Sequence, residues 1–342
     1  MRNTVKSAWV KSALAKLAVA AAVSLPAVSM ANYSEHPQAQ SFIETMTKKH
    51  GFDANWVNGV LAGAEKKQSI LDAIARPAES VMTWGRYRRI FIQDTRIDQG
   101  VEFWNTYRDA LERAEAEYGV PAQMIVGIIG VETRYGRNKG SYRVVDALAT
   151  LGFDYPKRGK FFLGQLEQYL LMVREQQFEP FSLVGSYAGA MGYGQFIPSS
   201  YRAYAVDFDG DNQADIVNNP VDAIGSVANY FAEHGWKKGE PVAFPALLAK
   251  SVDDAQFNTG LKPVKTLSEL AKVGIRPEAK LAGELKATAM KLDGAEGDEY
   301  WVGLNNFYVI TRYNHSAMYA MAAWQLSQLV AEKYHASMTA SR

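Results

Sequence analysis

Glu132 is the carboxylate whose surroundings best suit proton transfer, and it lies in the segment GIIGVETRYGRNKG at residues 127–140. Pro121 is well placed to begin a helix. Three- and four-residue steps then put an apolar stripe and the carboxylate on one helical face: Ile125, Ile128, Ile129 and Glu132. The helix should stop near Gly136, so Glu132 would lie in its last turn, beside carbonyls that carry partial negative charge. Both surroundings disfavour an ionised carboxylate, so Glu132 would stay protonated near neutral pH and could donate a proton to a leaving group.

The same segment allows two other placements of Glu132. The side chain could lie on the hydrated side of the helix, or it could pair with Arg134 or Arg137. These alternatives remain open on the evidence of this segment alone.

A second informative segment, GSYAGAMGYGQFIPSSY at residues 185–201, is rich in glycine. Four glycines fall within ten residues, beside Ser186, Gln195 and aromatic side chains such as Tyr193. Glycine lets a ligand approach the backbone closely, and hydroxyl and amide groups can bind the ligand's polar atoms. These features predict a sugar-binding cleft, although a tight packing corner between helices would use the same residues.

An acid-rich loop follows at residues 207–222, with the sequence DFDGDNQADIVNNPVD. The loop reproduces the start of an EF-hand calcium loop at Asp207, Asp209, Asp211, Gln213 and Asp215. Two positions depart from that pattern, because Asn212 replaces a glycine and Asn218 replaces a bidentate glutamate. Asp222, in the first turn of the next helix, could supply the missing carboxylate. We therefore predict a cation site, with a solvated turn as the alternative.

Helical periodicity dominates the chain up to about residue 236. The expected helices include residues 101–118, residues 161–174 and a segment that begins at Asn219-Pro220 and ends before Gly235. The expected strands are residues 285–292, 300–304 and 307–311. Helical spacing returns at residues 317–334, so the sequence predicts a small sheet between helical regions.

The N-terminal residues have the features of a secretory signal. Basic residues precede an apolar run at residues 17–28, and cleavage is expected after Ala31. The run is short for a membrane span, and an uncleaved anchor is the alternative. The 342 residues include no cysteine, so the chain has neither a disulfide nor a lipid-modified cysteine. A formal net charge of +1 without a long basic run gives no electrostatic signal for nucleic-acid binding.

Four separated motifs, in order, resemble the lytic murein transglycosylase B family: GVETRYG, GSYAGAMGYGQFIPSSY, DFDGDNQAD followed by NNPVDAIGSVANYFAEHGW, and RYNHSAMYA. The resemblance runs from about Phe42 to Leu329. It implies a mainly α (α+β) fold, with a lysozyme-like helical core, an additional helical domain and a small β-sheet domain. The expected divisions are a signal peptide at 1–31, a helical domain at 32–110 completed by a C-terminal helix at 313–336, a catalytic core with the EF-hand-like loop at 111–238, and a small β-containing domain at 239–312.

The resemblance also implies an activity. The family cleaves the β-1,4 bond between MurNAc and GlcNAc of peptidoglycan in the periplasm and leaves 1,6-anhydro-MurNAc ends. Glycan strands and stem peptides would be the ligands, cell-wall synthases the possible protein partners, and the oligomeric state has no signal in the sequence. Hydrolysis of the goose-type lysozyme kind and a non-catalytic peptidoglycan-binding scaffold are the competing interpretations.

Matching the motifs residue by residue makes Glu132 the sole catalytic acid and base, without a catalytic cofactor. Substrate-binding positions implied by the resemblance and by the glycine-rich segment are Tyr87, Lys157, Arg158, Ser186, Tyr193, Gln195, Tyr230, Tyr313, Asn314 and Tyr319. Among these, Lys157 and Arg158 fall where the family binds the stem peptide. The calcium ion, expected to be structural, would be held by Asp207, Asp209, Asp211, Gln213, Asp215 and Asp222.

Overall fold

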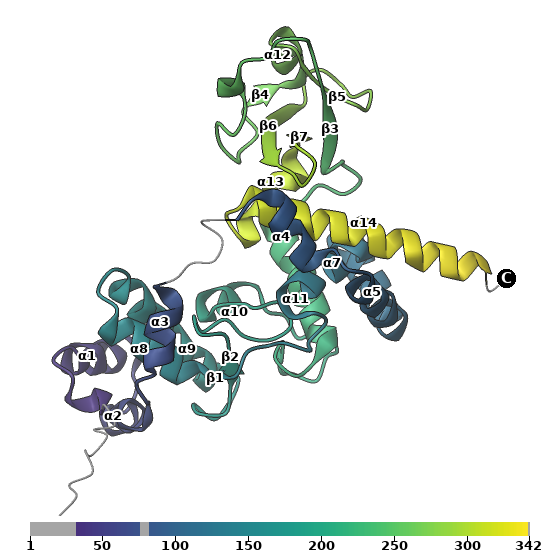
Figure 1. Ribbon diagram of the computed structural model, residues 1–342. Helices are drawn as coiled ribbons and strands as arrows, with labels where there is room; N and C mark the ends of the chain where they lie inside the picture. Colours follow the sequence, from purple (N-terminus) through teal and green to yellow (C-terminus); the bar gives the residue numbers. More distant parts are fainter. Residues whose placement is uncertain (1–31, 76–81, 341–342) are drawn as a thin grey trace, which may run out of the picture. The chain divides into compact units, whose positions relative to one another are not determined.

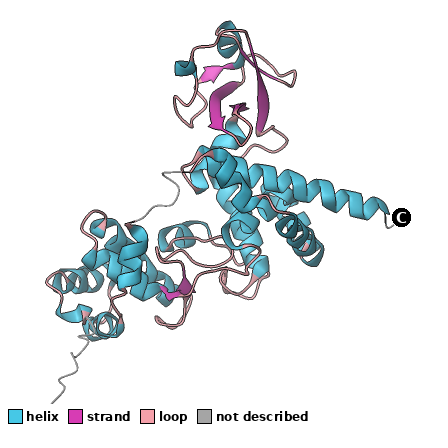
Figure 2. Ribbon diagram, viewed as in Figure 1, coloured by secondary structure: helices cyan, strands magenta, loops and turns pink. Residues whose placement is uncertain are grey.

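The structure, a computed structural model, describes residues 32–75 and 82–340, and the expected signal peptide lies outside these residues. Helices predominate, as Figure 2 shows. In chain order they are α1 (Ala39–His50), α2 (Ala54–Gly63), α3 (Gln68–Ile74), α4 (Trp84–Phe91), α5 (Asp94–Thr106), α6 (Arg108–Tyr118), α7 (Ala122–Thr133), α8 (Val144–Asp154), α9 (Gly159–Glu175), α10 (Pro198–Tyr204), α11 (Pro220–Glu233), α12 (Leu267–Lys272), α13 (Asn305–Tyr313) and α14 (Ala317–Ala340). None of the helices in these ranges is long and apolar enough to cross a bilayer.

The strands in the described part of the chain form two antiparallel sheets. A two-stranded sheet pairs β1 (Tyr142–Arg143) with β2 (Val184–Gly185). A five-stranded sheet has the order β4-β6-β7-β3-β5 and consists of β3 (Ala243–Leu248), β4 (Lys265–Thr266), β5 (Ile275–Pro277), β6 (Lys286–Asp293) and β7 (Asp298–Gly303). It buries its own cluster, which includes Phe257, Leu270 and Val302. The predicted small sheet is therefore confirmed, and within it β6 pairs with β7.

Two expected elements differ from the structure. Residues 307–311, predicted as a strand, belong to α13, because Phe307 and Ile310 lie one helical turn apart and both enter the helical core. Residues 101–118, predicted as one helix, form the end of α5 and all of α6. Tyr107 separates them with φ −114° and ψ 30°, although the amphipathic pattern runs through it.

The helices labelled in Figure 1 fall into two groups, which are defined by the clusters of buried apolar side chains that they contribute to. Helices α1–α3 pack with α8 and α9, whereas α4–α7 pack with α11, α13 and α14. Helices α1–α3, before residues 76–81, and helices α4 and α5, after them, thus contribute to different clusters. The sequence analysis had placed all of these helices in one domain at 32–110. The long C-terminal helix, α14, packs on α4, α5 and α7, so it covers the helix that carries Glu132.

Helix α7 can approach α14 closely because its contact surface contains Gly127. A Cβ atom at this position would lie 2.8 Å from the carbonyl oxygen of Ala323 and 2.8 Å from the Cβ of Ser327. Both distances are shorter than van der Waals contact. The glycine therefore sets how near the last helix comes to the candidate site.

Candidate active site

Glu132 lies in the last turn of α7 and is half-buried, as its apolar face and the following glycine predicted. The helix ends at Thr133, and Arg134, Tyr135 and Gly136 then adopt positive φ values of 52°, 59° and 81°. A Cβ atom on Gly136 would come within 2.1 Å of the Tyr193 ring, so only glycine fits there. This turn brings the glycine-rich segment against the end of α7. Thr133 strengthens the junction by donating its hydroxyl to the Tyr193 carbonyl at 3.0 Å.

A cluster of tyrosines surrounds Glu132. Tyr319, from α14, donates its hydroxyl to Oε1 of Glu132. The Tyr319 ring stacks on Tyr313, with 6.5 Å between centroids and 10° between planes. Burial, followed by the charge of Glu132, raises the pKa of both tyrosine hydroxyls well above the ordinary value. Both residues are therefore neutral hydrogen-bond donors over the whole physiological range.

The tyrosine cluster also fixes the glycine-rich segment. Tyr313 donates its hydroxyl to the Gly194 carbonyl at 2.6 Å, while Tyr230 donates to the Arg312 carbonyl at 2.6 Å. Tyr230 is buried and its ring centroid lies 4.7 Å from that of Tyr313. Burial raises the pKa of Tyr230 to about 12. Tyr230 thus packs against the ring of Tyr313. Tyr87 is also buried and lies close enough to Tyr319 to raise the pKa of the Tyr319 hydroxyl further.

The remaining predicted cleft residues organise the glycine-rich segment itself. Ser186 accepts hydrogen bonds from the backbone N–H groups of Ala188 and Ala190, at 3.3 and 3.1 Å. Gln195 has a φ of 52°, and its Nε2 donates to the carbonyls of Lys139 and Gly192 at 3.3 and 3.0 Å. These bonds hold the backbone of the glycine-rich segment in a fixed shape.

The side chains of Tyr193, within the glycine-rich segment, and of Asn314 are both half-buried. The ammonium group of Lys139 lies 4.7 Å from the centroid of the Tyr193 ring. Asn314 directly follows α13, one residue after Tyr313. Five of the predicted positions, Glu132, Tyr87, Tyr230, Tyr313 and Tyr319, are linked to one another. Tyr193 instead contacts Thr133 and Gly136, on the C-terminal side of Glu132.

Glu132 opens into a cavity of about 610 Å³. Its polar lining includes Arg96, Gln99 and Asn138, none of which the sequence analysis assigned to the site. Arg96 donates Nη1 to the Gly130 carbonyl at 3.2 Å, and burial lowers the pKa of its guanidinium. No local pattern signals this residue, because its contact spans 34 positions of sequence.

Arg134 and Arg137, the possible partners of Glu132 in the sequence, bind other groups in this cavity. Arg134 donates Nε to Oε1 of Gln99 at 2.7 Å, and Arg137 pairs with Glu102 at 3.0 Å. The cavity therefore offers cations and amides beside one half-buried carboxylate, which suits a polar ligand that carries hydroxyl and acidic groups.

Lys157 and Arg158 are exposed in the turn between α8 and α9. The Arg158 guanidinium lies over the ring of Phe161, at 4.4 Å from its centroid. In the described part of the chain these two cations form no hydrogen bond, ion pair or ring contact with the tyrosines around Glu132. Their predicted role depends on a ligand long enough to reach them.

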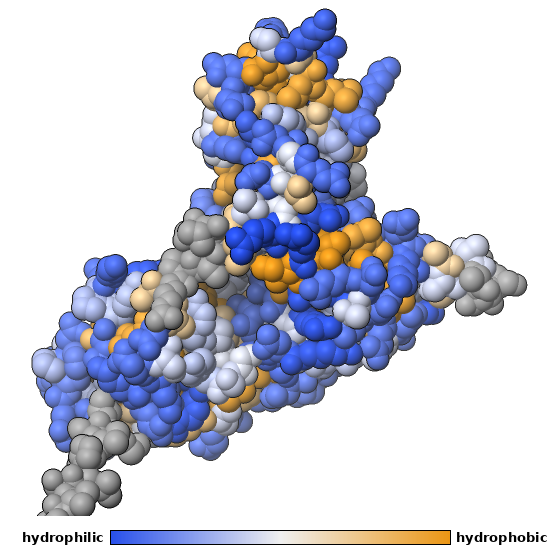
Figure 3. All heavy atoms as spheres, in the orientation of Figure 1, coloured by the Kyte–Doolittle hydropathy of each residue, from blue (hydrophilic) through white to orange (hydrophobic). Residues whose placement is uncertain are grey.

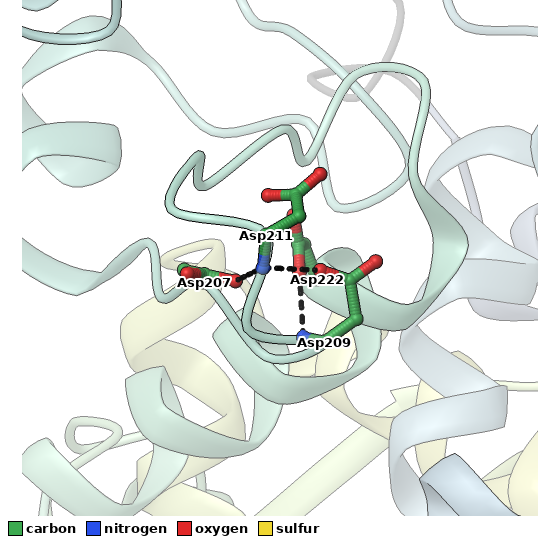
Figure 4. Close-up of side chains that lie close together, drawn as sticks. All are labelled: Asp207, Asp209, Asp211 and Asp222. Atoms are coloured by element: carbon green, nitrogen blue, oxygen red, sulfur yellow. Dashed lines mark hydrogen bonds between the residues drawn. The ribbon is translucent and has the colours of Figure 1, made fainter.

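Four carboxylates of the acid-rich loop converge, as Figure 4 shows for Asp207, Asp209, Asp211 and Asp222. Each offers an oxygen within 4.8 Å of the others. Hard oxygen ligands at such spacing are the donors that Ca²⁺ prefers, so this set fits the predicted ion. Asn212 adopts a left-handed φ of 72°, which explains how asparagine replaces the glycine of the EF-hand pattern.

Asp222 is the buried member of this set, with no exposed surface. It accepts backbone hydrogen bonds from Phe208 at 2.7 Å, Asp209 at 3.3 Å and Asp215 at 2.8 Å. Burial raises its pKa and the charge of Asp209 adds to the rise, whereas the backbone bonds lower it. A bound cation would relieve this crowding of negative charge.

The two other predicted ligands lie outside the group of four carboxylates. The carboxylate of Asp215 instead caps the following turn by accepting from the backbone of Val217 at 3.0 Å and of Asn218 at 2.9 Å. The side-chain amide of Gln213 donates to the Gln176 carbonyl at 2.9 Å. Only the backbone carbonyl of Gln213 then corresponds to its expected ligand role in an EF-hand loop.

Comparison with known proteins decides the family. The family model described as "Transglycosylase SLT domain" matches residues 34–328, which is most of the chain. This chain belongs to the transglycosylase SLT domain family. The match includes Glu132, the glycine-rich segment and the acid-rich loop.

Family relatives resemble the chain over most of their length. Membrane-bound lytic murein transglycosylase B of Escherichia coli (strain K12) is 48% identical over 309 residues, covering 88% of this chain and 84% of the relative. Lytic transglycosylase Slt35 of Escherichia coli, solved in complex with calcium, is 49% identical with a TM-score of 0.82, covering 89% of this chain and 96% of that one. SltB3 of Pseudomonas aeruginosa, solved in complex with NAG-NAM-pentapeptide, is 30% identical with a TM-score of 0.76, covering 85% and 78%. These similarities confirm the predicted fold class and family.

Proposed function

We propose that this chain carries out lytic transglycosylation with Glu132 as its only catalytic acid and base. The chain is a peptidoglycan lytic transglycosylase that cleaves the MurNAc–GlcNAc β-1,4 bond with formation of 1,6-anhydro-MurNAc ends, in keeping with its family. The observation that carries the assignment of Glu132 is its position at the cavity, where Tyr319 orients its carboxyl group.

The reaction proceeds in two steps on the same carboxyl group. Glu132 first donates its proton to the glycosidic oxygen, and the C1–O bond breaks. The N-acetyl oxygen of the substrate stabilises the positive charge that develops at C1, as substrate-assisted glycosidases allow. Glu132, now ionised, accepts the proton of the C6 hydroxyl, whose oxygen bonds to C1 and closes the anhydro ring. No water is consumed, and the carboxyl group regains its proton.

The nearest downstream acids have other structural roles. Asp146 is buried and pairs with Arg143 at 2.8 Å, while Asp154 pairs with Lys66 at 2.8 Å. Ordinary glycoside hydrolysis uses two carboxylates across the scissile bond. Because both carboxylates are already paired with basic side chains, the single-carboxylate mechanism is favoured over that of a lysozyme-type hydrolase.

Product masses test this reaction directly. Digestion of purified sacculi by the full chain should release muropeptides that are one water lighter than the products of a lysozyme, as mass spectrometry can measure. Reducing ends in place of anhydro ends would establish hydrolysis. Absence of any released product, with retained binding, would indicate a non-catalytic scaffold.

The other predicted site residues orient the sugar substrate and take no part in proton transfer. We assign Ser186, Gln195 and Asn314 to orienting the muramoyl sugar and its amide, because they belong to the segment or helix end next to the tyrosine cluster. Tyr193 provides an aromatic surface, whereas the buried Tyr87 and Tyr230 hold the cluster in place.

Lys157 and Arg158 are proposed to bind carboxylates of the stem peptide, since both are exposed and adjacent. Replacing both with alanine should reduce product release from intact murein more than from peptide-free glycan strands. Lys48→Ala with Lys49→Ala, another exposed adjacent pair, is the matched control and should change neither rate. Equal losses on the two substrates would contradict the assignment.

The acid-rich loop is proposed to bind one calcium ion that stabilises the fold and takes no part in the reaction. Asp207, Asp209, Asp211 and Asp222 would hold it, together with the Gln213 carbonyl. We also place the enzyme in the periplasm, with export directed by residues 1–31, because peptidoglycan is its substrate. Cell-wall synthases are the proposed protein partners there.

A further inference from the structure

A second concave site lies where the turn between α1 and α2 meets the end of α9. It measures about 500 Å³ and shares no lining residue with the cavity at Glu132. The residues that give it chemical character are Phe52, Asp53, Trp56, Arg174, Gln177 and Glu179. Phe52 and Val173 belong to the cluster formed by α1–α3, α8 and α9, whereas Val131 and Tyr319 at the catalytic site belong to the other cluster.

An exposed aromatic surface forms one wall of this second site. Trp56 keeps 37% of its surface exposed, and its ring stacks on Phe52 with 5.4 Å between centroids and 25° between planes. The guanidinium of Arg174 lies 4.1 Å from the Phe52 centroid and donates Nη1 to the His50 carbonyl at 2.8 Å. Asp53 accepts the backbone N–H of Trp56 at 2.8 Å. Stacking on Phe52 thus holds the indole against this wall, while the bond to Asp53 fixes the backbone of Trp56.

Polar side chains surround the aromatic surface. Asp53, Arg174, Gln177 and Glu179 are all exposed. A flat indole beside carboxylate and amide groups suits a sugar, whose ring face is apolar and whose edge carries hydroxyl and acetamido groups. Two carboxylates against one guanidinium, which is already engaged by Phe52, disfavour an acidic peptide. These features therefore favour a sugar ring over an acidic peptide.

We propose that this second site binds the glycan strand of peptidoglycan while another segment of polymer occupies the cavity at Glu132. The inference rests on the proposed function, because that function makes a long glycan the substrate. Two linked binding sites raise the apparent affinity for a polymer without any added contact at the catalytic carboxylate. The site would keep the enzyme on the cell wall between cleavage events.

Binding to insoluble peptidoglycan tests this site. The parent protein is Glu132→Gln, and the fraction that sediments with sacculi is compared with that of Glu132→Gln carrying Trp56→Ala. A second set of assays uses glycan strands whose stem peptides have been removed. Loss of an aromatic anchor should weaken binding to both materials roughly tenfold. Trp56→Phe keeps a ring and should retain part of the affinity.

Leu247→Ala is the matched control. Leu247, on β3, is also an exposed hydrophobic residue, with 57% of its surface accessible, but it lies outside the second site. Figure 3 shows other hydrophobic surface in the part of the chain that carries the sheet. This variant should bind like the parent, and unchanged melting should show that Trp56→Ala is folded. Unaltered binding of Trp56→Ala, or a loss confined to material that carries peptides, would overturn the proposal. The proposed role of Glu132 is tested separately in the same samples. If the Glu132→Gln parent released products, that role would be wrong, whatever the binding result.

Discussion

Replacing Glu132 with glutamine should lower the rate of peptidoglycan cleavage at least about a hundredfold, which is the usual effect of losing a general acid. Glutamine keeps the size and shape of the side chain, and it can still accept a hydrogen bond from Tyr319. It cannot give a proton to the glycosidic oxygen or take one from the C6 hydroxyl. Both steps therefore fail together. The measurement is the rate at which anhydro-muropeptides appear from purified sacculi.

Glu102→Gln is the control for this variant. Glu102 is an exposed carboxylate that pairs with Arg137 at the edge of the same cavity, so the change removes a nearby charge without touching the acid. Its rate should stay within a few-fold of the wild type, since an exposed ion pair contributes roughly 0–1 kcal/mol. Near-normal turnover by Glu132→Gln, with an unchanged melting profile, would show that another group transfers the proton.

Replacing Asp222 with alanine should destabilise the fold by about 1–3 kcal/mol, because the buried N–H of Phe208 loses its acceptor and one unsatisfied buried group costs about that much. The N–H groups of Asp209 and Asp215, which also lose this acceptor, are only part-buried. The change should shift the first unfolding transition in urea to a lower concentration. The shift should appear even in the presence of a chelator, because these hydrogen bonds do not need the ion. It should also abolish the stabilisation by calcium.

Asp209→Ala with Asp211→Ala separates ion binding from loop structure. Both carboxylates are exposed, so the chelated variant should unfold close to the chelated wild type. Calcium should raise the melting temperature of the wild type, because a ligand that binds only the native state stabilises it by mass action. The double variant should show no such rise. Equal responses to calcium in all three proteins would mean that the acid-rich loop is a solvated turn.

Local patterns in the sequence predicted the elements of the fold better than their boundaries. Helix α7 and its end were predictable because Pro121 and Gly136 flank an apolar stripe. The break at Tyr107 was not, because the apolar pattern of α5 continues in phase into α6. Residues 307–311 have the β-branched and aromatic composition of a strand, but packing of Phe307 and Ile310 on the helical core overrides that preference.

The candidate site was predictable where the chemistry lies within one segment. Glu132 and the four converging aspartates follow from short motifs. The role of Arg96 depends on a contact with Gly130, which only the folded chain creates. Burial also changed the interpretation of Tyr87 and Tyr230, since an aromatic side chain in a motif gives no sign of whether it faces the ligand or the core.

The hydrogen bond between Tyr319 and Glu132 joins residues 187 positions apart, and this spacing sets how much of the chain must be made before the active site is complete. At about 5–20 residues per second, roughly 10 to 40 seconds of translation separate the two residues. A nascent chain that already contains the acid therefore lacks the residue that orients it and the helix that covers α7. A chain released too early could not attack the cell wall, because the last helix completes the active site.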